Sequence, residues 1–277
     1  MTHAAAPSGP FADESLLSIV APAHNEAENL PKLVEEVGAA MGGFDFEFIV
    51  VDDASSDDTV RLVGDLMADR PWLRLISLSK PETGGNGQSA AFRAGFAAAH
   101  GDWIGSLDAD LQNDPAEFPR LIAEQRRTGA DMVQGDRSEA RRTGDAWIRQ
   151  FTSIVGRVFR RTLLADTIRD TGCSLRIMRR EIGVRLPLEF RGLHRFIPVT
   201  ARQLGYEVVE LPVGHRARYA GTPKYGVGIT KRAIPGLVDC FAVRWMRHRR
   251  RHAVASETPR AVSNERAGEP VSTGGTA

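Results

Sequence analysis

Residues 101–115, GDWIGSLDADLQNDP, decide the fold. They begin with a short apolar run, 103–107, which is typical of a buried strand, and two aspartates, Asp108 and Asp110, follow it directly. Because one residue separates them, the two carboxylates can point the same way. Like charges this close need a cation to remain ionised together, and oxygen ligands suit Mg²⁺ or Mn²⁺. The motif therefore predicts a metal site, and the competing interpretation is a solvated acidic turn before a helix that Pro115 opens.

Strands and helices are expected to alternate on both sides of this stretch. The predicted strands are residues 16–21, 46–51, 73–78, 103–107 and 132–134, and the helices between them begin near Asn29, Ser55 or Ser56, Ser89 and Pro115. This alternation implies βαβ units on a mostly parallel sheet, an α/β fold of Rossmann-like type. Ligands in such sheets bind beyond the carboxyl ends of the strands. The second half is more mixed, with helices expected at 145–164, 193–204 and 229–247 and strands at 173–178 and 208–213.

Composition is that of an ordinary globular protein, with 277 residues, 42% of them hydrophobic and 26% charged. The net charge of +1 argues against a general nucleic-acid binder. The two cysteines, Cys173 and Cys240, form no metal-binding or disulfide pattern, so a reduced, cytoplasmic compartment fits best. No signal peptide and no run of roughly 18 apolar residues is present, so no membrane-spanning helix is expected.

Four segments follow from these patterns. Residues 1–14 and 253–277 are rich in small and polar residues and are expected to be disordered, around an α/β domain at 15–226. Residues 227–252 are expected to form an amphipathic, basic helix. Its apolar stripe comprises Ile234, Leu237, Val238, Phe241 and Trp245, and the arginines that crowd its end are Arg244, Arg247, Arg249, Arg250 and Arg251. This pattern favours an interfacial helix on anionic lipid over a stripe that packs on the domain.

Polar side chains follow the first two predicted strands as well. The first set lies in PAHNEAEN, residues 22–29, and the second in VVDDASSDDT, residues 50–59. A carboxylate beyond a strand end can accept a hydrogen bond from a sugar hydroxyl or a base N–H, and Asp53 is the better candidate because helix capping accounts for residues 55–58. Three bases in glycine-containing loops, Arg137, Arg218 and Lys224, suit phosphate binding, against the alternative that they are solvated surface residues.

Five motifs in this order resemble those of glycosyltransferase family 2. They are PAHNEAEN, VVDDASSDDT, GGNGQSAAFRAG, GDWIGSLDADLQNDP and GTPKYG, and within the family they are most similar to dolichol-phosphate mannosyltransferase and bacterial polyprenyl-phosphate glycosyltransferases. The resemblance covers about residues 16–226. It implies a GT-A fold, a nucleotide-diphosphate sugar as donor and inversion at the anomeric carbon.

The resemblance also assigns roles by position. The residues it places on the nucleotide-sugar are Pro22, His24, Glu26, Val51 and Asp53. The metal-diphosphate motif is Asp108, Ala109 and Asp110, with Gln112 as a further metal ligand. Arg137 matches an arginine near the donor and acceptor phosphates, whereas Arg218 and Lys224 match bases that grip the acceptor phosphate, a group that His194 and Arg195 extend. His24 departs from the tyrosine or phenylalanine common in relatives.

The implied reaction moves a sugar to a polyprenyl phosphate, dolichyl or undecaprenyl, at the cytoplasmic face of a membrane. The protein would be peripheral there, with a small separate membrane protein as a candidate partner. A phosphate acceptor needs no general base. In the late part of the chain, residues 214–226 supply basic side chains and no acidic one, which favours a phosphate acceptor. The nearest rival is a family member with a hydroxyl acceptor, for which Asp170 is the candidate base.

Two readings from other classes fit less well. A nucleotidyltransferase would carry a loop rich in Gly and Arg where this chain has residues 22–29. A non-catalytic nucleotide-sugar binding protein would not need Asp108, Asp110, Arg218 and Lys224 together.

Overall fold

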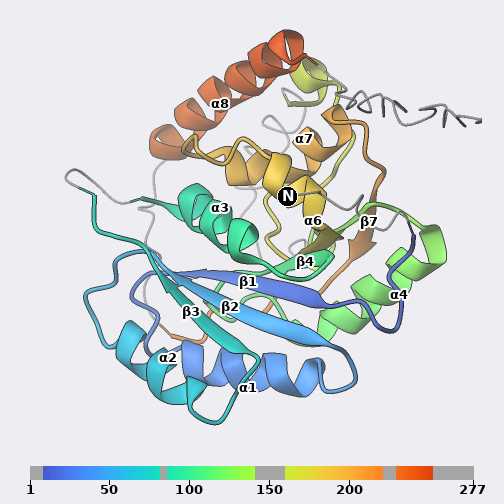
Figure 1. The fold of residues 1–277 in the computed structure, drawn as a ribbon. Helices are drawn as coiled ribbons and strands as arrows, with labels where there is room; N and C mark the ends of the chain where they lie inside the picture. Colours follow the sequence, from blue (N-terminus) through green and yellow to red (C-terminus); the bar gives the residue numbers. More distant parts are fainter. Residues whose placement is uncertain (1–8, 82–85, 141–159, 221–228, 252–277) are drawn as a thin grey trace, which may run out of the picture.

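The computed structural model describes residues 9–81, 86–140, 160–220 and 229–251, and the side chains of 229–234 are not among the described ones. A seven-stranded sheet in the order β3-β2-β1-β4-β6-β5-β7 forms its centre, with helices on both faces (Figure 1). The strands are β1 (Leu17–Ala23), β2 (Phe46–Asp52), β3 (Leu73–Ser77), β4 (Trp103–Ser106), β5 (Met132–Asp136), β6 (Arg176–Arg179) and β7 (Val208–Pro212).

Strand direction brings distant parts of the chain to one edge. β1 pairs in parallel with β2 and β4, β2 with β3, and β5 with β7. β6 lies antiparallel to both β4 and β5, so these two run the same way. The carboxyl ends of the parallel strands therefore meet at one edge, together with Arg176, the first residue of β6. We call this the carboxyl edge, and the predicted α/β fold with a mostly parallel sheet is confirmed.

Helices cover the two faces of the sheet separately (Figure 1). On one face lie α1 (Leu30–Ala40), α2 (Thr59–Met67), the short helix η1 (Pro115–Glu117) and α4 (Phe118–Thr128). On the other lie α3 (Gln88–Ala98), α6 (Arg180–Arg185), η3 (Leu193–Phe196), α7 (Ile197–Gln203) and α8 (Ile229–Arg249). Strand side chains alternate between these two cores, as the pleat requires: Ile19 of β1 packs with the first and Val20 with the second.

A close approach fixes α3 against the sheet. Gly95 in α3 faces β1 so closely that an added Cβ would lie 2.3 Å from a methyl group of Val20. Only glycine fits at that distance, because a side chain would push the helix away. The contact places the first turn of α3 at the carboxyl edge, beside the end of β4.

Several boundaries differ from the sequence expectations. Helix α2 begins at Thr59, with Asp58 at the N-cap position, rather than at Ser55 or Ser56. Residues 9–14, part of the segment expected to be disordered, lie against the domain, because Phe11 is buried against Trp103. Most of the helix expected at 145–164 lies outside the described residues, although 160–164 are helical.

The helix α8 occupies Ile229–Arg249, within the segment predicted to be an amphipathic, basic helix, and its amphipathic character stays a prediction. Residues 253–277 lie outside the described residues. Among the described residues, no helix is both long and apolar enough to cross a membrane. Cys173 and Cys240 are both free and buried.

Candidate active site at the carboxyl edge

The loops after three parallel strands each contain a residue in the left-handed region. These residues are Asn25 after β1 (φ 51°), Ala54 after β2 (φ 54°) and Leu111 after β4 (φ 61°). Residues other than glycine adopt this conformation at an energetic cost, and such strain gathers at functional sites. The three loops adjoin one another because β2, β1 and β4 are neighbours in the sheet.

Hydrogen bonds hold the first two loops together. The backbone N–H of Asn25 donates to the Ser55 hydroxyl (2.8 Å), and the Asn25 side-chain oxygen accepts from the Ser56 backbone N–H (2.7 Å). The Glu26 N–H donates to Thr59 Oγ1 (2.9 Å). Ser55 therefore serves the loop–loop contact and not the helix cap that the sequence suggested. Asp114 caps η1, because its carboxylate accepts from the Ala116 N–H (2.9 Å).

The two aspartates of the central motif lie at the middle of this edge. Asp108 is half-buried and its Oδ1 accepts from Gln88 Nε2 of α3 (2.6 Å). Asp110 is buried, its Oδ1 accepts from the Gln112 backbone N–H (3.1 Å), and its Oδ2 lies 2.7 Å from Nη2 of Arg218. The loop after β7 thus reaches back across the edge to the acidic motif.

The electrostatics of Asp110 match a cation site. Burial and the neighbouring Asp108 raise the pKa of Asp110 to about 6, and Glu26 adds to this effect while Arg218 opposes it. A carboxylate that is hard to ionise alone is stabilised by a bound cation. The described residues contain no cluster of three or more His, Cys, Asp or Glu side chains arranged for a metal. Two carboxylates fit a divalent ion that takes its remaining ligands from substrate phosphates and water.

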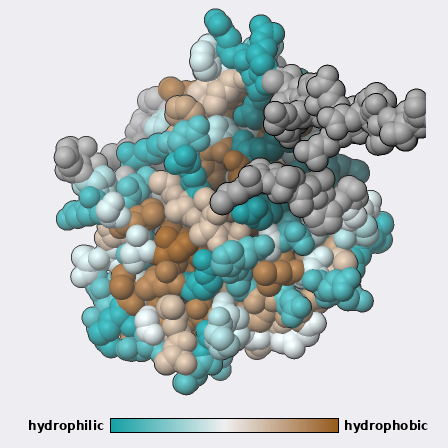
Figure 2. Space-filling view, viewed as in Figure 1, coloured by the Kyte–Doolittle hydropathy of each residue, from teal (hydrophilic) through white to brown (hydrophobic). Residues whose placement is uncertain are grey.

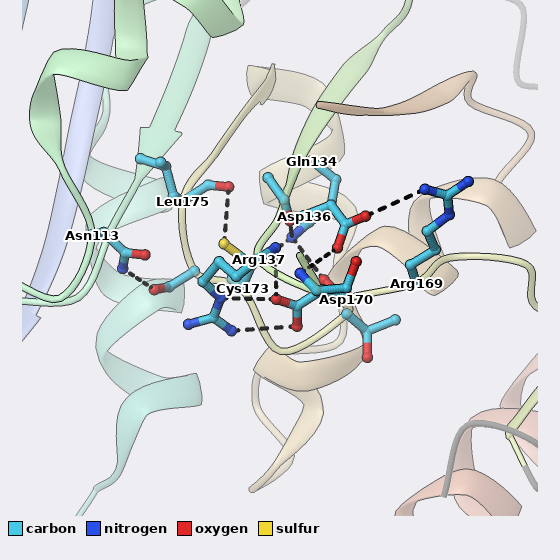
Figure 3. Close-up of polar contacts among 12 residues, drawn as sticks. Asn113, Gln134, Asp136, Arg137, Arg169, Asp170, Cys173 and Leu175 are labelled. Atoms are coloured by element: carbon cyan, nitrogen blue, oxygen red, sulfur yellow. Dashed lines mark hydrogen bonds and ion pairs between the residues drawn. The ribbon is translucent and has the colours of Figure 1, made fainter. Parts of the chain in front are cut away.

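Arg137 and Asp170 form a buried ion pair at the same edge (Figure 3). Arg137 follows β5, and its Nε and Nη2 donate to the two oxygens of Asp170 at 2.8 and 3.3 Å. Their side chains are only 5% and 10% exposed. Asp170, the candidate base for a hydroxyl acceptor, is therefore engaged by a guanidinium.

Arg176 is a residue of this region that the sequence interpretation missed. It is 2% exposed, and its Nε and Nη1 have no hydrogen-bond partner among the described residues, while Nη2 donates to the Cys173 carbonyl. Burial lowers the pKa of Arg176 to about 10, although Cys173 and Asp108 oppose this effect, so it stays charged near neutral pH. The signal available in the sequence was a basic residue inside an otherwise apolar strand pattern. Its neighbourhood to the acidic motif arises from the fold, because the two are far apart in the chain.

His194 does not add a positive charge to the site. Its Nδ1 lies 2.9 Å from the hydroxyl of Ser89, and burial lowers its pKa to about 3. The imidazole is therefore neutral and cannot act as a cationic phosphate ligand. Its hydrogen bond instead ties η3 to the first turn of α3, next to Gln88.

The residues assigned to the nucleotide-sugar differ in how far they are exposed at the carboxyl edge. His24 is exposed, with Nδ1 2.7 Å from the Asp53 carbonyl oxygen. Asp53 Oδ2 accepts from the Gly87 N–H (2.8 Å), and its buried Oδ1 has no partner among the described residues. Ala109 is buried in the first core and Val51 in the second. Pro22 is half-buried, and Glu26 is buried and accepts from Asn29 Nδ2 (2.5 Å).

Of the remaining assigned residues, Gln112 contacts the loop after β7 and Arg218 belongs to that loop. The carbonyl of Gln112 accepts from the Arg216 backbone N–H (2.9 Å), which joins this loop to the acidic motif. Arg218 meets Asp110, as described above. Lys224 lies outside the residues that the structure describes.

Comparison with known proteins identifies the family. Residues 18–183 match the family described as glycosyl transferase family 2. The chain is also 35% identical over 228 residues to an undecaprenyl-phosphate 4-deoxy-4-formamido-L-arabinose transferase of Enterobacter sp. (strain 638), with 81% of this chain and 67% of that protein covered. The chain belongs to glycosyltransferase family 2, and it is a glycosyltransferase.

Solved structures agree on the fold. Glucosyl-3-phosphoglycerate synthase from Mycobacterium tuberculosis, with Mn²⁺, UDP-glucose and phosphoglyceric acid bound, is similar with a TM-score of 0.61 and 22% identity over 82% of this chain and 80% of that one. The same enzyme with Mg²⁺ and UDP gives a TM-score of 0.58 and 22% identity over 82% and 79% of the two chains. The GT-A fold expected from the sequence is therefore confirmed.

Proposed function

We propose that this protein transfers a sugar, with inversion, from a nucleotide-diphosphate sugar to a polyprenyl phosphate. The observation that carries the proposal is the 2.7 Å contact between Asp110 and Arg218. It brings together a carboxylate suited to a metal–diphosphate complex and a guanidinium suited to a phosphate acceptor. The curated relative is a transferase named for undecaprenyl phosphate, which supports the same class of acceptor.

The donor side would be built from the acidic motif. Asp108 and Asp110 would hold Mg²⁺ or Mn²⁺, with Gln112 as a further candidate ligand, and the ion would neutralise charge on the departing diphosphate. The β1 and β2 loops, with His24, Glu26 and Asp53, would bind the nucleoside. Gln88 fixes one oxygen of Asp108, so this carboxylate is held in place before the donor arrives.

The acceptor side would work without a general base. A phosphomonoester oxygen is already anionic near neutral pH and would attack the anomeric carbon from the face opposite the diphosphate, through a transition state that resembles an oxocarbenium ion. Arg218, Lys224 and Arg137 would bind and orient this phosphate. The pairing of Asp170 with Arg137 speaks against Asp170 as the base for a hydroxyl acceptor.

A polyprenyl phosphate resides in a membrane, so the protein would act there as a peripheral enzyme at the cytoplasmic face. A small separate membrane protein that presents the lipid is a candidate partner. The direct experiment supplies purified protein with NDP-sugars and undecaprenyl phosphate in detergent and detects the glycolipid by mass. Transfer to hydroxyl acceptors alone would contradict the proposal.

Arg218→Ala is expected to raise the KM for the acceptor about tenfold to a hundredfold, because one charged phosphate contact contributes about 1.5–3 kcal/mol. Donor affinity, measured by calorimetry with Mg²⁺ present, should change much less. Arg218 is proposed to bind the acceptor and not the nucleotide-sugar, and its ion pair with Asp110 would compete with the metal for that carboxylate. Lys224→Ala should behave in the same way.

Arg216→Ala provides the matched control. Arg216 lies two residues away on the same loop and pairs with Glu36 (2.7 Å) and Asp114 (2.5 Å) rather than with the central motif. Its acceptor KM should stay near that of the parent protein. Equal losses of donor and acceptor affinity in Arg218→Ala would contradict the assignment of Arg218 to the acceptor phosphate.

A further inference from the structure

α8 has apolar side chains on two opposite sides. Cys240 and Val243 are buried, and Met246 packs with them against the second core. These residues recur at the spacing of one helical face. We call these three residues the inner face of α8, and this face makes the contacts with the second core.

The outer face of α8 carries large apolar side chains that are exposed. Phe241 and Trp245 are four residues apart, so they share a face, and they are 57% and 62% exposed. Leu237 and Val238 lie one turn earlier and are also exposed. Figure 2 shows brown and tan atoms beside teal ones at the top of the molecule, where α8 lies. Large apolar side chains grouped on one exposed helix face mark a contact surface.

Positive charge surrounds this outer face. Arg249 and Arg251 are exposed, and the guanidinium of Arg249 lies 5.9 Å from the centre of the Trp245 ring. Arg244 is exposed at the border of this face, where its Nη1 donates to the Leu163 carbonyl (2.9 Å). Within residues 235–251, whose side chains are described, the one acid is Asp239, which faces Gly192 on the domain side.

The positive charge continues onto the domain beyond α8. Arg250 borders an open hollow of about 810 Å³ beside α3 and α6. Among the described residues, the other charged side chains that line it are Arg93, Arg185 and Glu189. The charge that a partner of this surface must carry is therefore negative.

We propose that the outer face of α8, made of Leu237, Val238, Phe241 and Trp245 with Arg244, Arg249 and Arg251, docks on the surface of a bilayer that contains anionic lipid. The apolar side chains would enter the acyl boundary, and the arginines would lie at the headgroups. The inference deepens the proposed function, on which it rests for the presence of a lipid substrate, and it names the surface that brings the enzyme to that substrate.

A second copy of the chain is a poorer occupant of this face. Pairing two outer faces would bring the arginines of one copy against those of the other, with no acid on either face to compensate. Anionic headgroups supply the missing negative charge, and each base near such a surface strengthens binding about fivefold.

The test is flotation of the full chain at low salt with vesicles of phosphatidylcholine alone or mixed equally with phosphatidylglycerol. The parent protein should float with the mixed vesicles only, and added salt should release it. Phe241→Gln and Trp245→Gln should each weaken binding by about tenfold or more, because each removes a large side chain from the acyl boundary. Arg249→Gln and Arg251→Gln should each weaken it about fivefold.

Val60→Gln is the matched control, because Val60 is 40% exposed on α2, a helix of the opposite face of the sheet. It should float like the parent protein. Equal flotation by all variants, binding to pure phosphatidylcholine, or self-association lost in Phe241→Gln would each overturn the proposal.

Transfer to detergent-dispersed undecaprenyl phosphate separates this result from the proposed function. The α8 variants should retain the parent rate there, because docking is bypassed. If the parent protein shows no transfer yet floats as expected, the docking surface stands and the acceptor assignment fails.

Discussion

Asp110→Asn should lower the rate of sugar transfer by at least about a thousandfold, because it removes one of the two charged ligands proposed for a cation that would stabilise the departing diphosphate. A loss of that size corresponds to about 4 kcal/mol of transition-state stabilisation, within the range expected for a metal ion at such a position. Asp108→Asn should have an effect of the same order. The measurement is the initial rate with saturating donor and Mg²⁺ or Mn²⁺.

Folding should survive this substitution. Burial and Asp108 already disfavour the charge of Asp110, so a neutral side chain of the same shape relieves repulsion, at the loss of a partly exposed ion pair with Arg218. The thermal midpoint should therefore stay close to that of the parent protein. This separates a lost metal ligand from a lost fold.

Asp114→Asn is the matched control for the acidic motif. Asp114 lies four residues further along, where it pairs with Arg216 (2.5 Å) and caps η1. Its variant should keep most of the transfer rate. Near-normal turnover by Asp110→Asn, with EDTA also harmless to the parent protein, would rule out the metal site.

Local pattern predicted the half of the fold that contains β1 to β4. Apolar runs alternating with amphipathic helices specify parallel βαβ units, and the first four strands begin within one residue of the predicted positions. The acidic motif was visible for the same reason, since two carboxylates directly follow a buried strand. The direction of β6 was not predictable, because a short apolar run does not reveal which neighbours it pairs with.

The contacts that complete the site depend on residues far apart in the chain. Asp170 appeared as a candidate base because no local feature points to Arg137, its partner 33 residues earlier. Arg176 was not singled out from the sequence, because its burial comes from the pairing of β6 with β4 on one side and β5 on the other. Similarly, Arg218 meets Asp110 only because β7 ends at the same edge as β4.

Removing the carboxylate of the buried pair should have the largest effect on stability. Asp170→Asn is expected to lower the free energy of unfolding by about 3–5 kcal/mol, because it leaves the guanidinium of Arg137 buried without its anion. Arg176 worsens the loss, since it is a second buried guanidinium close enough to act on Arg137, and two of its nitrogens have no partner among the described residues. Denaturant unfolding followed by circular dichroism measures the change.

An exposed ion pair supplies the comparison. Asp58 pairs with Arg61 at 3.1 Å on the surface of α2, where both side chains are at least 60% exposed. Asp58→Asn should leave stability almost unchanged, because water solvates the arginine that remains. A loss in Asp170→Asn no larger than that in Asp58→Asn would show that the Arg137 charge is not held by this contact.

The double variant Arg137→Met, Asp170→Leu separates the two roles of the pair. Apolar side chains of similar size can replace a buried ion pair with little loss of stability, so most of the stability lost in Asp170→Asn should return. Transfer should stay low, because Arg137 is proposed to bind phosphate and methionine cannot. Recovery of both stability and transfer would make the pair purely structural and would leave Arg218 and Lys224 as the proposed bases of the acceptor site.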